Sequence, residues 1–161
     1  MKLTKEDENF LRAAIRLAEE GMNNNVGGPF GAVIVKDGKI IGKGSNNVTS
    51  SNDPTAHAEI TAIRAACEHL NDFQLDGCTL YTSCEPCPMC LGAIYWARPS
   101  RVVYAATAED ADKIAGFDDS FIYDEINLAP KDRSIPAINA LREEGQEVFQ
   151  AWQAKTDKIE Y

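Results

Sequence analysis

The chain has 161 residues, 44% of them hydrophobic and 25% charged, with a formal net charge of −9 at pH 7. This length suits a single domain, residues 1–161, with a sizeable core. The acidic balance argues against a nucleic-acid partner, because proteins that grip phosphate backbones usually present a basic face. No run reaches the roughly 18 apolar residues of a membrane span, and the start lacks the apolar core of a secretory signal. We therefore expect a cytoplasmic protein without a membrane partner.

The first half of the chain predicts a helix, a hairpin and a second helix. Residues 4–20 have an apolar helical face, and Thr4 and Asp7 have the spacing of a capping box. A β-hairpin follows, because β-branched runs flank Asp37-Gly38, a pair that favours a type I′ turn. Apolar residues recur with helical spacing again over about 55–70.

Strands and helices alternate in the second half. A short strand is predicted over 78–83, a helix from the following cysteines to about residue 96, and another strand over 101–106. Short helices and loops follow, with a final helix around 147–155. This order implies a mixed sheet between two helical layers. In such sheets the ligand site lies beyond the carboxyl ends of strands, where helices begin.

The stretch SCEPCPMC, residues 83–90, raises the question of a bound metal. Cys87 and Cys90 lie three apart at a predicted helix start, so they share one face, and a helix N-terminus favours the thiolate that binds metal. Cys84 precedes the helix and is a less obvious ligand. A catalytic zinc site needs a third protein ligand and an open position.

The chain has two histidines that could be the third ligand, and their positions differ. His69 lies near the end of a predicted helix and fits a solvated surface position. His57 lies at a helix start, two residues before Glu59. Residues two apart on a regular helix point roughly 200° apart, so both reach one site only if the end of the helix itself points into it.

The motif H-x-E at 57–59, followed by P-C-x-x-C at 86–90, resembles the signature of the zinc-dependent base deaminases. The blocks GGPFGAVIV, DPTAHAEITAIR, YTSCEPCPMCLGAIYWAR and GFDDSFIY are similar to the guanine deaminase branch and cover most of 10–126. The resemblance implies an α/β, cytidine deaminase-like fold, a three-layer α/β/α sandwich with a mixed five-stranded sheet.

The resemblance also implies a mechanism. His57, Cys87 and Cys90 would bind one Zn²⁺ per chain and leave a position for water, whose pKa such a site lowers to about 7. Glu59 would be the catalytic residue, taking a proton from the water and returning it to a ring nitrogen and then to departing ammonia. The implied reaction is the hydrolytic deamination of a free purine base, guanine to xanthine plus ammonia.

The resemblance also points to substrate contacts. The candidates are Asn46, Asp118, Phe30, Trp96, Tyr161 and Cys84. The residues themselves leave other roles open: a turn residue that ends a strand for the asparagine, core packing for the two aromatic residues 30 and 96, and simple packing for the cysteine. The aspartate, with its neighbour Asp119, could equally belong to a solvated acidic loop.

The C-terminal tail, about 140–161, is unusual for a minimal deaminase. The resemblance implies a homodimer in which this tail crosses to the partner subunit and covers the active site, with Tyr161 helping to close it. The alternative is a helix docked on its own domain with a frayed end.

Other functions remain open at this point. The same zinc site serves guanosine, cytosine and the adenosine of transfer RNA, although an acidic chain is poorly suited to the last of these. Cys84-x-x-Cys87-x-x-Cys90 could hold an iron–sulfur cluster instead, but the fourth cysteine expected soon after is absent. A purely structural zinc site is disfavoured by three ligands beside a glutamate.

Overall fold

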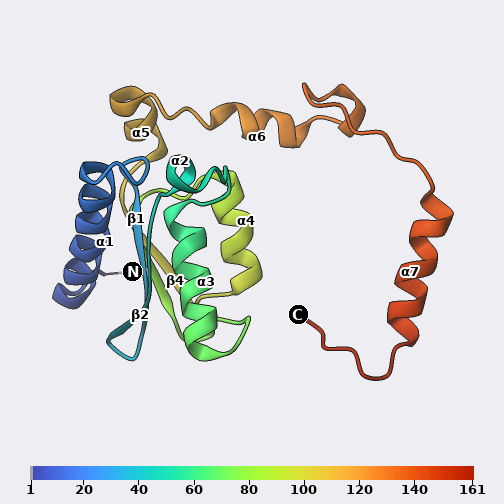
Figure 1. The fold of residues 1–161 in the computed structure, drawn as a ribbon, viewed down its shortest axis with the longest axis horizontal. Helices are drawn as coiled ribbons and strands as arrows, with labels where there is room; N and C mark the ends of the chain where they lie inside the picture. Colours follow the sequence, from blue (N-terminus) through green and yellow to red (C-terminus); the bar gives the residue numbers. More distant parts are fainter. Residues whose placement is uncertain (1) are drawn as a thin grey trace. The chain divides into compact units, whose positions relative to one another are not determined.

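The computed structural model describes residues 2–161, which form two compact units. The first unit ends at Asp119, and the second is Ser120–Tyr161. All strands of the described chain lie in the first unit, which Figure 1 draws in blue to yellow-brown.

The first unit is built on a sheet of four strands in the order β2-β1-β3-β4. They are β1 (Gly31–Lys36), β2 (Lys39–Ser45), β3 (Thr79–Cys84) and β4 (Arg101–Ala106). Strand β1 pairs antiparallel with both β2 and β3, whereas β3 and β4 are parallel. The predicted mixed sheet is therefore confirmed.

The prediction of five strands is wrong. After β4 the chain enters α5 (Ala108–Ala115), because Thr107 and Asp110 form a capping box that starts a helix there. The later elements are α6 (Ser120–Asn127), the 3-10 turn η1 (Pro130–Asp132) and α7 (Arg142–Ala154). Pro136, between the last two, lacks the N–H that a strand ladder needs. The part of the chain described after β4 therefore adds no strand.

Helices cover both faces of the sheet (Figure 1). Helix α1 (Lys5–Asn23) lies on one face, over a core to which Val33 of β1 contributes. Helices α3 (Ala58–Leu70) and α4 (Pro88–Ala97) lie on the other, over a core that includes Ile34. One strand supplies both cores because successive side chains point to opposite faces. The predicted three-layer α/β/α arrangement is confirmed.

Local signals set several element boundaries. Thr4 and Asp7 form the predicted capping box at the start of α1. Asp37 and Gly38 both have positive φ, 49° and 71°, as a type I′ turn requires. The short helix α2 (Val48–Ser51) was not predicted, because its polar sequence VTSS is typical of a loop.

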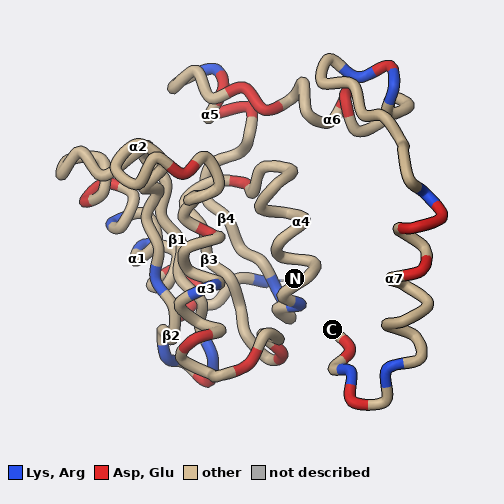
Figure 2. The backbone as a smooth tube through the Cα atoms, turned by 45° about the vertical axis from the view of Figure 1, so that its right-hand side comes forward, with Lys and Arg blue, Asp and Glu red and all other residues tan. Residues whose placement is uncertain are grey.

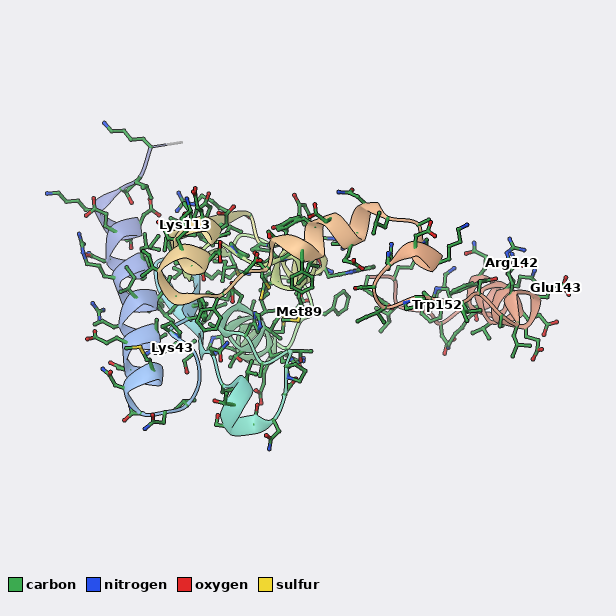
Figure 3. The ribbon with its side chains drawn as sticks, turned by 90° about the horizontal axis from the view of Figure 1, so that it is seen from above. Lys43, Met89, Lys113, Arg142, Glu143 and Trp152 are labelled. Carbon is green, nitrogen blue, oxygen red and sulfur yellow. The ribbon has the colours of Figure 1, made fainter. Side chains whose placement is uncertain are left out.

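The second unit has no core of its own. None of residues 120–161 is buried. Its exposed large apolar side chains include Phe121, Ile126, Ile135, Ile138, Leu141, Val148, Phe149, Ile159 and Tyr161. Figure 3 shows the side chains of α7 extending from the helix, Trp152 among them. A segment that buries so little apolar surface cannot offset its own conformational entropy. Its stability must therefore depend on surface outside its own residues.

Charges are mixed over the chain. Figure 2 shows Lys and Arg interspersed with Asp and Glu along the described elements. Every helix that the structure describes is too short or too polar to span a lipid bilayer.

Candidate active site

Two helix N-termini face each other at the site. His57 is the N-cap residue of α3, and Cys87 is the N-cap residue of α4. The backbone of His57 is extended, with φ −71° and ψ 159°. Because His57 lies outside the helix, the roughly 200° separation between helical residues two apart does not apply to it and Glu59. The end of α3 therefore points into the site, as the sequence motif demanded.

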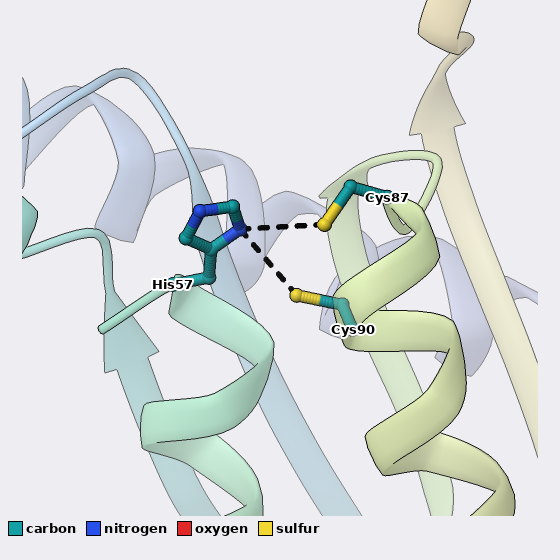
Figure 4. A group of neighbouring side chains, drawn as sticks. All are labelled: His57, Cys87 and Cys90. Carbon is teal, nitrogen blue, oxygen red and sulfur yellow. Dashed lines mark hydrogen bonds between the residues drawn. The ribbon is translucent and has the colours of Figure 1, made fainter. Parts of the chain in front are cut away.

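The side chains of His57, Cys87 and Cys90 point toward one another (Figure 4). The Nδ1 atom of His57 lies 3.5 Å from the Sγ atom of Cys87 and 3.5 Å from that of Cys90. A tetrahedral zinc ion with bonds of about 2.0 Å to nitrogen and about 2.3 Å to sulfur would set those atoms about 3.5 Å apart. All three ligand atoms lie within 4.8 Å of one another. The donor set and its spacing therefore fit zinc.

The cluster already favours one thiolate. The Cys90 thiol donates a hydrogen bond that, with contributions from the His57 ring and the Cys90 backbone N–H, lowers the pKa of Cys87 to about 4. The hydrogen bond between the His57 ring and Cys87 raises the pKa of His57. As the donor of the pair, Cys90 has a raised pKa, but a metal cation deprotonates the thiols that coordinate it.

Glu59 is buried beside this cluster. Its side chain is 6% exposed, and burial is the largest cause of a raised pKa, reinforced by the negative charge of Cys87. A carboxyl group whose pKa is raised in a cleft is a candidate proton carrier.

A cavity of about 730 Å³ opens at these residues. It is lined by residues of the first unit alone: Met22, Asn25, Gly27, Gly28, Phe30, Asn46, Val48, Thr49, Pro54, His57, Glu59, Cys84, Glu85, Cys87, Ala108, Ala111, Phe117, Asp118 and Asp119. Glu59 and two of the three metal candidates, His57 and Cys87, therefore line one cavity with four of the six predicted substrate contacts, and Cys90 is buried behind them.

Asn46 is held in a fixed orientation in this wall. Its Oδ1 atom accepts hydrogen bonds from the backbone N–H groups of Gly28 at 3.1 Å and Val48 at 3.3 Å. A side chain on Gly27 would overlap the Asn46 carbonyl, so only glycine allows this close approach. Both hydrogen bonds use the oxygen, so the amide NH₂ group remains the donor that the side chain can offer a ligand.

An aromatic pair forms another part of the wall. Phe30 and Phe117 pack edge to face, with ring centroids 4.9 Å apart and planes at 80°. Phe117 was missed in the sequence, although it directly precedes the candidate Asp118. The neighbouring Asp119 has a raised pKa, chiefly because of burial and then because of the charge on Cys87.

Cys84 lines the cavity, but its thiol is engaged with the backbone. Its Sγ atom donates to the Thr107 carbonyl at 3.5 Å. Burial raises its pKa to about 11, so the thiol stays protonated at neutral pH. Cys84 therefore contributes a neutral thiol to the cavity wall, and its contact with substrate stays a prediction.

Two predicted contacts are not among the cavity-lining residues of the described chain. Trp96 lies on α4 and is 62% exposed. Tyr161 belongs to the second unit and is 69% exposed. Their roles stay predictions.

Comparisons with known proteins identify the relatives of this chain. Residues 4–106 match the family model of the cytidine and deoxycytidylate deaminase zinc-binding region. The guanine deaminase of Bacillus subtilis is 62% identical over 154 residues, which cover 96% of this chain and 98% of that protein. A crystal structure of guanine deaminase from Bacillus subtilis superposes with a TM-score of 0.94 at 60% identity and covers 99% of both chains.

A more distant relative matches a shorter part of the chain. The tRNA-specific adenosine deaminase of Aquifex aeolicus is 46% identical over 99 residues, which cover 62% of this chain and 65% of that protein. The family model spans more than half of the chain and includes His57, Cys87 and Cys90. The chain therefore belongs to the cytidine and deoxycytidylate deaminase family and carries its zinc-binding region.

Proposed function

We propose that this protein is a guanine deaminase, which hydrolyses guanine to xanthine and ammonia. The observation that carries the proposal is the cluster of His57, Cys87 and Cys90 beside a cavity that His57, Glu59 and Cys87 line, in a chain so similar along its length to the Bacillus subtilis guanine deaminase. In this proposal His57, Cys87 and Cys90 bind one Zn²⁺ per chain. When bound, zinc acts as a Lewis acid that makes a water molecule a stronger acid.

Glu59 then carries the protons of the reaction. Its carboxylate accepts one proton from the attacking water and gives it to a ring nitrogen of the base. The water oxygen bonds to the carbon that bears the amino group. Glu59 then takes the remaining proton from that oxygen and passes it to the amino group, so that the carbon–nitrogen bond breaks, ammonia leaves and the oxygen becomes the carbonyl of xanthine. The burial that raises the pKa of Glu59 supports this role, because a general acid–base group works best when its pKa lies near the working pH.

The cavity wall offers the groups that a purine needs. The fixed amide NH₂ of Asn46 can donate to a carbonyl oxygen or ring nitrogen of the base. Phe30 and Phe117 offer apolar surface for the ring. Asp118 is our proposed acceptor for N–H groups of guanine, and Trp96 and Tyr161 remain candidates for closing the pocket.

Guanosine is the second candidate substrate. A cavity of about 730 Å³ lies well within the range of pockets for drug-sized ligands, about 300–1,000 Å³, and a base alone leaves much of it unfilled. Whether the remaining space admits a ribose separates the two candidates.

Ammonia release from the zinc-loaded protein tests the proposal, with guanine, guanosine, cytosine and adenine compared side by side. We expect rapid turnover of guanine. A preference for guanosine would show that the substrate is the nucleoside and not the free base. Zinc binding without turnover of any of the four compounds would contradict the proposed function and favour a structural metal site. A coloured, iron-containing protein would favour an iron–sulfur cluster at the three cysteines.

We also propose a homodimer whose C-terminal tail is exchanged between subunits. The support is the second unit, where no residue is buried and large apolar side chains are exposed. A second copy of the chain offers exposed apolar surface against which these side chains could pack, including Tyr95 and Trp96 of α4.

A role in purine metabolism in the cytoplasm completes the proposal. All five cysteines are free thiols, and two of them belong to the candidate zinc site. A reducing compartment keeps such thiols available for metal. Detection of the protein only in an oxidising compartment would contradict this location.

A further inference from the structure

The loop between β3 and α4 is joined to the chain at the start of α5 by three hydrogen bonds. Cys84 and Ala106 are partners in the parallel pairing of β3 with β4. Just beyond them, the Glu85 backbone N–H donates to the Ala106 carbonyl at 2.9 Å, and the Cys84 thiol donates to the Thr107 carbonyl at 3.5 Å. The third contact uses a side chain: the N–H of Ala108 donates to Oε2 of Glu85 at 3.1 Å.

The third contact satisfies a specific vacant donor of α5. The first N–H groups of a helix have no partner within it. The capping box of Thr107 and Asp110 occupies the N–H groups of those two residues. Ala108, the first residue of α5, receives its acceptor from Glu85, 23 residues earlier in the chain. A carboxylate is a strong acceptor there because of the helix dipole.

Little else fixes the position of α5. None of its eight residues is buried, so apolar packing contributes little to its placement, and an eight-residue helix has marginal stability by itself. The hydrogen bonds at its N-terminus therefore carry much of the restraint.

The far end of α5 leads into the cavity wall. Helix α5 closes with hydrogen bonds from the N–H of Gly116 to the Asp112 carbonyl at 2.8 Å and from the N–H of Phe117 to the Ala111 carbonyl at 3.1 Å. Phe117 and Asp118 follow at once and line the cavity. A shift of α5 would thus displace both of them.

We propose that Glu85 is a positioning residue that holds α5, and through it Phe117 and Asp118, in place relative to the metal loop. The metal loop is the segment 85–87 between β3 and α4, which ends at the candidate ligand Cys87. Glu85 exchanges no proton with substrate in this role. Its carboxylate aligns the base-binding end of the cavity with the hydrolytic end. The inference rests on the proposed function for its kinetic consequence, but not for the link between Glu85 and α5.

Three variants test the proposal: Glu85→Ala, Glu85→Gln, and Glu109→Ala as the control. Glu109 is an exposed carboxylate in the first turn of the same helix and forms an ion pair with Lys113. Hydrogen exchange of residues 107–117 reports on α5, zinc content on the metal loop, and steady-state kinetics on guanine binding and turnover.

In Glu85→Ala we expect α5 to exchange about tenfold faster. The KM for guanine should rise about tenfold while kcat changes less than about threefold, because binding groups move and the hydrolytic groups do not. Zinc content should stay at the wild-type level. Glu85→Gln should restore most of both values, since its amide oxygen can accept the Ala108 N–H. The control Glu109→Ala should leave KM unchanged and speed exchange in α5 by less than about threefold, as expected for the loss of one exposed ion pair and one first-turn carboxylate.

Unchanged exchange and KM in Glu85→Ala would overturn the proposal. Loss of zinc with unchanged exchange in α5 would also overturn it, because Glu85 would then support the metal loop alone. A wild-type protein that does not turn over guanine would refute the proposed function, while the exchange comparison would still decide whether Glu85 holds α5.

Discussion

At the scale of single residues, Glu59 is the group on which the proposed chemistry most depends. It shares the cavity with His57 and Cys87, and its burial raises the pKa of its carboxyl group. An exposed glutamate at the same helix position would merely interact with the helix dipole. Burial beside the candidate metal site instead supports its proposed role as a proton carrier.

Glu59→Gln should keep zinc and fold while kcat falls by about 10²- to 10⁴-fold, because the amide cannot accept and return a proton. Ammonia release and zinc content measured on the same sample check this. Glu68→Gln, an exposed change on the same helix, should leave both unchanged. Turnover near the wild-type rate in the Glu59 variant, with zinc retained, would remove Glu59 from the mechanism.

The metal-site residues could be predicted because their two short motifs resemble the signature of the zinc deaminases, within which the chain sets the local spacing. Cys87 and Cys90 lie within one helical turn, and His57 and Glu59 within three residues. Phe117 could not be predicted in the same way, because it meets Phe30 only once most of the first unit has folded.

At the scale of elements, a buried charged group ties α1 to the sheet. The hydroxyl of Tyr81 in β3 donates to Asp7 Oδ1 at 2.6 Å, and Arg101 at the start of β4 pairs with the same carboxylate. The pKa of Asp7 is strongly lowered, chiefly by the Tyr81 hydrogen bond and then by the backbone N–H of Thr4. Asp7 therefore stabilises the first unit as well as capping α1.

Asp7→Asn should lower the free energy of unfolding at pH 7 by about 2–3 kcal/mol, below the range for a fully buried pair because the Arg101 side chain is 25% exposed. The folded pKa of Asp7 lies below the unfolded value of about 4, so its contribution is full above that pH and is lost as the pH falls toward the folded pKa.

Urea unfolding at pH 7 and pH 3 measures both effects. The advantage of the wild type over Asp7→Asn should narrow at pH 3. Glu6→Gln, which removes a charge from the same helical turn, should cost less than about 1 kcal/mol. An advantage that is equal at both pH values would show that the Asp7 charge does not stabilise the fold.

Element types could be predicted where apolar periodicity is strong, as in α1 and β4. The fifth strand was implied by the resemblance alone, because the sequence after β4 reads as short helices and loops, and this implication was wrong. Strand prediction depends on partners, and the segment after Asp119 buries none of its side chains within the chain. The polar sequence of α2 likewise gave no periodicity to detect.

At the scale of the whole molecule, residues 120–161 pose a question of stability. They include two helices, α6 and α7, yet bury no residue. Exposed apolar side chains on this scale mark an association surface. The proposed exchange of the tail between two copies would give this unit the burial that it lacks.

Truncation after Gln150 tests that exchange. It removes Trp152 of α7 and the terminal Tyr161, so we expect the dimer to dissociate at micromolar concentration and kcat/KM for guanine to fall by at least about tenfold, because apolar burial between subunits and closure of the pocket are both lost. Light scattering after gel filtration and ammonia release measure the two effects. The single change Glu160→Gln, which leaves the tail in place, should preserve both dimer and activity. A truncated protein that remains a fully active dimer would show that the tail neither joins the subunits nor closes the pocket. The exposed apolar residues of α6 and of the segment before α7 would then be the remaining candidates for the interface.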